Sequence, residues 1–103
     1  MPKTWGGRSN FNYSGSVETG TEIIYGKGWK VYVSAERYIA LRRHFIDRIV
    51  PVGTSRTEPP KGSLGERLQA NVTRSAIACY VASILVIEGY AKHVRKHDIC
   101  IIK

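Results

Sequence analysis

The spacing of apolar positions changes several times along the chain, and each change predicts a different element. Over residues 22–33, β-branched and aromatic residues form two short runs on either side of Gly26-Lys27-Gly28. Two such runs around a glycine-containing turn are typical of a β-hairpin. The preceding residues 1–20 are rich in Gly, Ser and Asn and have no apolar period, so we expect a flexible tail there.

A helical period follows the predicted hairpin. Ser34 is a suitable N-cap, and Glu36 lies in the first turn, where the helix dipole favours a carboxylate. One apolar stripe is expected along this helix: Tyr38, Leu41, Phe45 and Ile49, widened by Ile39 and Ile46. The run RIVPV (48–52) then predicts a short strand, and the Gly- and Pro-rich residues 53–62 predict an exposed loop.

Two further helices and a ribbon complete the predicted fold. Ser63 and Glu66 have the spacing of a capping box, which predicts a short helix that ends near residue 71. The stretch TRSAIACYVASILVIEGYA (73–91) predicts a longer buried helix, capped by Thr73 and ended by Gly89. Residues 90–103 predict two short strands around a polar turn at about 96–98.

The long helix is expected to have two distinct faces. Its inward positions form an apolar stripe of Ile77, Val81, Ile84 and Leu85. Its outward face carries Arg74 and Ser75, followed by small residues that include Ala78 and Ala82. We therefore expect a single α+β domain over residues 21–103, with three helices, an N-terminal hairpin and a C-terminal two-stranded ribbon.

The stretch SLGERLQANVTRSAIACYVASILVIEGYA resembles the core of a bacterial winged-helix domain, a helix-turn-helix DNA-binding family, and the resemblance covers residues 34–102. It implies that Leu64 and Leu68 lie on the first helix of the pair and that residues 71–73 form the turn. It also implies that residues 88–90 lead into a wing. A fainter resemblance links the whole chain to small uncharacterised proteins of bacterial mobile elements, notably integron gene cassettes. This second resemblance implies a genetic context and no mechanism.

The charge of the chain indicates a polyanionic partner. Sixteen Lys and Arg face eight Asp and Glu, which gives a formal net charge of +8 and a pI near 9.8. With the winged-helix resemblance, this predicts a homodimer that binds double-stranded DNA, as a transcriptional regulator would. Seven residues form the expected interface: Arg67, Thr73, Arg74, Ser75, Lys92, Arg95 and Lys96.

A second interpretation assigns the chain to another class, a homo-oligomeric protein-interaction module that binds no DNA. The outward small residues and the hairpin aromatics would then form the subunit interface: Tyr25, Trp29, Tyr32, Ala78 and Ala82. The same aromatics could instead stack on single-stranded bases between lysines, although packing on a helix or a second subunit is the favoured role.

Several functions are not expected from this sequence. The uncharged apolar stretch over residues 76–87 is shorter than the ~20 residues of a spanning helix, and no signal peptide is evident, so a cytoplasmic protein is expected. No nucleophile is paired with a base, which argues against an enzyme. His93, His97 and Cys100 offer three possible ligands where structural zinc needs four, so no metal, cofactor or small-molecule substrate is expected.

Overall fold

Two small antiparallel sheets and three helices form an α+β fold in the described part of the chain. The computed structural model describes residues 3–5, 7, 10–53, 61–71 and 77–103, and the statements below concern these residues. In chain order the elements are β1 (Asn12–Ser16), β2 (Gly20–Tyr25), β3 (Trp29–Val33), α1 (Ala35–Phe45), β4 (Ile49–Pro51), α2 (Leu64–Asn71), α3 (Ala78–Ile87), β5 (Ala91–Arg95) and β6 (Asp98–Ile101).

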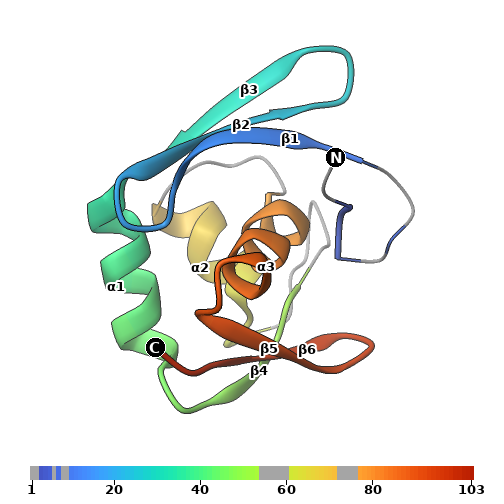
Figure 1. Ribbon diagram of the computed structural model, residues 1–103. Coiled ribbons are helices and arrows are strands. Elements are labelled where there is room, and N and C mark those ends of the chain that lie inside the picture. The colour runs from blue at the N-terminus through green and yellow to red at the C-terminus, as the bar shows by residue number, and fades with distance from the viewer. Residues whose placement is uncertain (1–2, 6, 8–9, 54–60, 72–76) are drawn as a thin grey trace.

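Helix α3 occupies the centre of the molecule. It lies between the sheet formed by β1, β2 and β3 and the sheet formed by β4, β6 and β5, with α1 and α2 beside it (Figure 1). Six of its ten residues are buried: Ala78, Val81, Ala82, Ser83, Ile84 and Leu85. Burial of this apolar surface is the main favourable term for the fold. Within the described ranges, no helix has the length and apolar character needed to cross a bilayer.

The N-terminal sheet has the strand order β1-β2-β3 and covers one side of α3. Its register pairs Tyr13 with Ile23 and Ile23 with Val31, so these side chains share the face toward the core. Tyr25 on the same face stacks on Tyr80 of α3, with ring centroids 4.8 Å apart. The predicted hairpin is therefore confirmed as β2 and β3, with β1 as a third strand.

The expectation of a flexible tail over residues 1–20 is wrong for the part that contains β1. Phe11 and Val17, on either side of this strand, are 2% and 1% exposed. The backbone N–H of Val17 and the hydroxyl of Tyr13 both donate to the carboxylate of Glu88, each at 2.9 Å. The strand itself, NYSGS, is largely polar and has no apolar period, yet the buried residues on either side of it and the contacts to Glu88 hold it against the core.

Helix α1 begins at the predicted cap. The Oγ of Ser34 accepts a hydrogen bond from the N–H of Arg37 at 3.3 Å. Tyr38, Leu41 and Phe45 are buried as expected, and the hydroxyl of Tyr38 hydrogen-bonds Thr21 of β2 at 2.7 Å. This bond between two buried hydroxyls fixes α1 against the N-terminal sheet.

The apolar stripe of α1 is narrower than predicted. Ile39 and Ile46 are each 43% exposed, and Ile49 is 56% exposed. The helix ends at Phe45, because Ile46 is extended and Asp47 adopts a left-handed conformation with φ of 60°. Ile49 consequently belongs to β4, and Ile39 and Ile46 lie outside the side of α1 that meets the core.

The remaining caps explain the second half of the fold. The Oγ of Ser63 accepts from the N–H of Glu66 at 3.1 Å, which confirms the cap of α2. Helix α3 begins at Ala78 with Ile77 as its N-cap, and the predicted cap, Thr73, lies outside the described residues. Gly89, with φ of 84°, follows the end of α3 as expected. The chain then forms β5 and β6, and β6 pairs with both β5 and β4.

The replacement Phe11→Ala tests whether the N-terminal segment belongs to the core. Removing this buried ring should lower the free energy of unfolding by about 3–5 kcal/mol, because the cavity is enclosed by the sheet and Tyr80. Urea unfolding followed by circular dichroism measures the change, with exposed Ser14→Ala in β1 as the control. Equal stability of Phe11→Ala and the unmodified protein would mean that the segment is a tail after all.

The Tyr13–Glu88 contact predicts a loss of stability at high pH. Burial, and then the hydrogen bond and negative charge of Glu88, raise the pKa of Tyr13 from 10.0 to about 12. Because the pKa is higher in the folded than in the unfolded protein, the contact stabilises the folded protein fully below pH 10. This contribution to the free energy of unfolding is lost as the pH rises through about 12. Urea unfolding across that range should show a shallower pH dependence for Tyr13→Phe, whereas Tyr32→Phe should retain the original slope.

Candidate nucleic-acid interface

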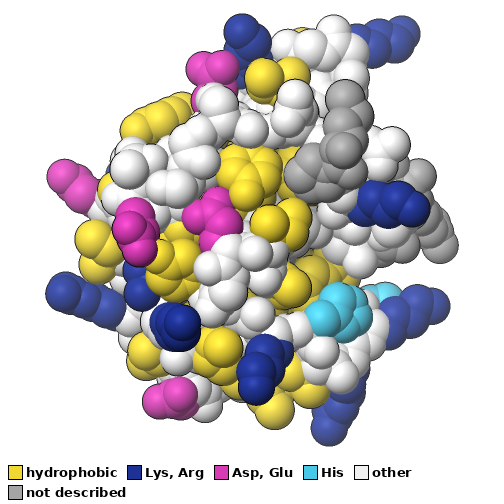
Figure 2. Space-filling model, viewed as in Figure 1, with side chains coloured by type: hydrophobic (Ala, Val, Ile, Leu, Met, Phe, Trp, Pro, Cys, Tyr) yellow, Lys and Arg dark blue, Asp and Glu magenta, His cyan; other side chains and the backbone are white. Residues whose placement is uncertain are grey.

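The hairpin of β5 and β6 carries three of the predicted interface cations. Lys92, Arg95 and Lys96 are all exposed. Asp98 at the start of β6 forms an ion pair with Arg95 at 3.6 Å, but the arginine side chain remains 74% exposed. Such a surface ion pair is worth little, so the positive field of the hairpin is largely retained. Figure 2 shows Lys and Arg side chains on either side of the histidines at this edge.

The hairpin is held in place by a residue near the other end of the chain. The Trp5 ring stacks on His93, with centroids 4.0 Å apart and ring planes within 6°. Its Nε1 donates to the carbonyl oxygen of Lys96 at 2.9 Å, and its backbone N–H donates to the carbonyl of Cys79 in α3 at 3.1 Å. Trp5 therefore connects the hairpin turn to the central helix.

A further hydrogen bond fixes the hairpin from the side of β4. The backbone N–H of Val52 donates to the carbonyl oxygen of His97 at 2.8 Å. Together with the Trp5 contacts, this bond restrains the backbone of the turn that carries Lys96. Groups positioned in advance lose less entropy when they bind a partner.

The small residues of α3 do not face outward as predicted. Ala78 is 1% exposed and Ala82 is 0% exposed, and both belong to the hydrophobic core. The N-terminal sheet meets α3 at Tyr80, on the side opposite both alanines, and α3 also contacts α2 and β5, so the helix is enclosed on more than one side. Neither alanine is available to a subunit interface, and the buried part of α3 is not available to a DNA groove.

The remaining residues of the predicted interface do not all join the hairpin. Thr73, Arg74 and Ser75 lie outside the described residues. Arg67 of α2 lies near the end of α1: the pKa of His44 is lowered by desolvation and then by the positive charges of Arg67 and Arg48. The described part of the interface therefore consists of the hairpin itself, Lys92, Arg95 and Lys96.

The exposed aromatics of β3 do not form a single stacking surface. Trp29 is 69% exposed and pairs with Tyr25, whose ring lies on the core face of the sheet. Tyr32 is 60% exposed and pairs with Glu22 on the opposite face. Paired residues share a face, and successive residues along a strand point to opposite faces. Trp29 and Tyr32, three positions apart, therefore lie on opposite faces and cannot stack on successive bases of one strand.

The histidines of the hairpin do not converge with Cys100. His93 pairs with the buried Ile99, whereas Cys100 pairs with Lys92, so His93 and Cys100 lie on opposite faces of the hairpin. Among the residues that the structure describes, no group of three or more His, Cys, Asp or Glu side chains is arranged to hold a metal ion.

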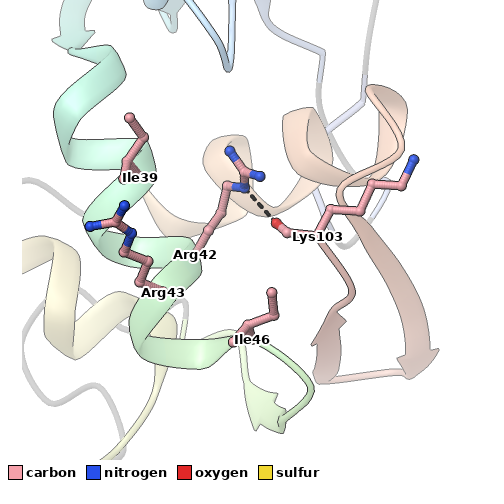
Figure 3. A pocket seen from close by; sticks show the side chains of 5 residues that line it. All are labelled: Ile39, Arg42, Arg43, Ile46 and Lys103. Carbon is pink, nitrogen blue, oxygen red and sulfur yellow. Dashed lines mark hydrogen bonds between the residues drawn. The ribbon is translucent and has the colours of Figure 1, made fainter.

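A second basic site, which the sequence pattern did not predict, lies on the outer side of α1. An open pocket there has two apolar and three basic lining residues: Ile39, Arg42, Arg43, Ile46 and Lys103. Figure 3 shows Arg42 pointing from α1 toward Lys103. The Nε of Arg42 donates a hydrogen bond to the main-chain oxygen of Lys103. The signal in the sequence was the i, i+3, i+4, i+7 spacing of Ile39, Arg42, Arg43 and Ile46, which marks a second face of α1 that continues to its C-cap.

Comparisons with known proteins give no relative from which a role could be transferred. A scan against protein-family models and searches of curated proteins and solved structures found no match to this chain. The resemblances to winged-helix domains and to cassette proteins accordingly stay predictions.

Proposed function

We propose that the protein binds double-stranded nucleic acid through the β5–β6 hairpin, chiefly by contacts to phosphates. The observation that carries this proposal is the group of exposed cations, Lys92, Arg95 and Lys96, on a hairpin restrained by Trp5. A group of exposed cations on a restrained hairpin, in a chain of net charge +8, suits a polyanion, because each phosphate contact releases condensed counterions.

In this proposal residues 34–102 form a winged-helix-like domain and the hairpin is its wing. The order α1, β4, α2, α3, β5, β6 supports the assignment, since it is the order expected from the sequence resemblance. The pairing of β4 with β6 supplies a third strand at the base of the hairpin. The departure is the N-terminal sheet, which covers α3.

The covered helix determines the mode of binding that we propose. Reading of bases by a helix requires side chains that reach into the major groove, and the buried Ala78 and Ala82 cannot do so. Contacts to phosphates carry no sequence information by themselves. We therefore propose binding with little sequence preference, in which affinity depends steeply on salt.

Neutralising the hairpin tests this proposal. The triple variant Lys92→Gln, Arg95→Gln, Lys96→Gln should bind duplex DNA more weakly and with a smaller salt dependence. If each cation contacts one phosphate, the slope of log affinity against log salt should fall by about 2.7, at 0.9 per contact. Fluorescence anisotropy of a labelled duplex, titrated at several salt concentrations, measures both quantities.

A second triple variant provides a control with the same loss of charge. Lys27→Gln, Lys30→Gln, Arg37→Gln removes three exposed cations from the β2–β3 hairpin and the first turn of α1. This control variant should reduce the long-range attraction to DNA only slightly and retain most of the slope of log affinity against log salt. Equal effects of the two triple variants would refute a localised interface, and failure of the unmodified protein to bind any duplex at low salt would refute the function.

Self-association through β3 is a second candidate function, favoured by the exposure of this strand. β3 is an edge of the N-terminal sheet and carries the exposed Trp29 and Tyr32. An edge strand presents backbone groups that can pair with a second chain, and exposed aromatics add contact area to such a pairing. This interface replaces the one predicted at Ala78 and Ala82.

The variant Trp29→Lys distinguishes this candidate. If β3 forms a subunit interface, a charge in place of the exposed ring at its first residue should dissociate the assembly and lower the mass measured by sedimentation equilibrium. Ile87→Lys, at an exposed position of α3, is the control and should leave the mass unchanged. A monomeric mass for the unmodified protein, or an assembly that survives Trp29→Lys, would exclude the β3 interface.

A further inference from the structure

The pocket on the outer side of α1 is distinct from the hairpin interface. Its volume is about 350 Å³, within the range of about 300–1,000 Å³ typical of small-molecule pockets. It is open to solvent between α1 and Lys103 (Figure 3). Neither Lys92, Arg95 nor Lys96 lines it, so it can be tested independently of nucleic-acid binding.

Three cationic side chains line the pocket, those of Arg42, Arg43 and Lys103. None of the three forms an ion pair with an Asp or Glu side chain in the described ranges. Arg42 is nevertheless fixed in position, because its Nε donates to the carbonyl of Lys103 and its guanidinium lies over the ring of Tyr90, 4.3 Å from the centroid. An oriented guanidinium is well suited to bind a carboxylate or phosphate.

The same pocket has an apolar part. Ile39 and Ile46 are exposed and lie among the arginines on one side of α1, where they line the pocket (Figure 3). Figure 2 likewise shows apolar side chains interspersed with Lys and Arg on the lower part of the molecule. A simple inorganic anion would use the cations and leave both isoleucines in water, whereas an aliphatic chain would cover them.

From this juxtaposition we propose that the pocket binds a small organic anion with an aliphatic chain, such as a medium-chain carboxylate. Arg42 and Arg43 bind the anionic group, and the chain lies along Ile39 and Ile46. A second copy of this surface is a poor occupant, because it would bring three cations against three cations. A nucleic-acid backbone matches the charge but offers the isoleucines no apolar partner.

The test is a titration of the full chain with octanoate, followed by two-dimensional NMR of the backbone amides. Octanoate should shift the resonances of residues 39–46 and 103 in a saturable manner. Acetate, which has the charge without the chain, and octanol, which has the chain without the charge, should each bind more weakly than octanoate by about tenfold or more. Equal binding of octanoate and either of these probes would overturn the proposal.

Matched arginine variants locate the site. Arg43→Gln should weaken octanoate binding about tenfold or more, since one charge-assisted contact is lost. Arg37→Gln, an exposed position in the first turn of α1 that does not line the pocket, should leave it unchanged. Neither replacement removes a core contact, so circular dichroism should show the same folded protein in both cases.

Two further results would overturn the proposal. Octanoate shifts that persist in Arg43→Gln would place binding elsewhere on the chain. Binding to vesicles that contain an anionic phospholipid, in the absence of any binding of free octanoate, would indicate a membrane-facing surface instead of a pocket. Ile46→Ser separates the apolar contribution: it should weaken octanoate binding and leave the weak binding of acetate unchanged.

Discussion

Burial of α3 on several sides is the constraint on which the rest of the structure depends. Val81, Ile84 and Leu85 are fully buried, and so are the small residues Ala78 and Ala82. A helix that is apolar around most of its circumference must be covered on more than one side. The β4–β6–β5 sheet provides one cover, and the N-terminal sheet provides the other, although the sequence of β1 is largely polar.

Local signals in the sequence predict much of this fold. These signals depend only on neighbours in the chain. The Ser34 and Ser63 caps locate α1 and α2, and the turn residues locate the strands of the two hairpins, β2 with β3 and β5 with β6. The errors concern which side of a helix is buried and which is exposed. Whether Ile39 or Ala82 is buried depends on which distant element covers that side of its helix, and spacing along one segment does not contain that information. The strand β1 is missed for the same reason.

The candidate sites differ in predictability for a related reason. The cations of the β5–β6 hairpin lie close together in the sequence, so their proximity in space follows once the hairpin is expected. The pocket is formed by Arg42 and Lys103, which are 61 positions apart, together with two isoleucines that are exposed instead of buried in the core. The two sites therefore share a positive charge but differ in chemistry, since only the second combines cations with exposed aliphatic side chains.

The Trp5 contact has a consequence for how the protein is made. Its indole nitrogen meets the carbonyl of Lys96, 91 positions later, and its ring rests on His93. During synthesis the N-terminal segment leaves the ribosome long before its binding partner exists. Contacts of such long range form late, because the whole intervening chain must first be brought together. The order in which the chain emerges is therefore the reverse of what this contact needs, and Trp5 can reach its place only after residues 93–96 have been made.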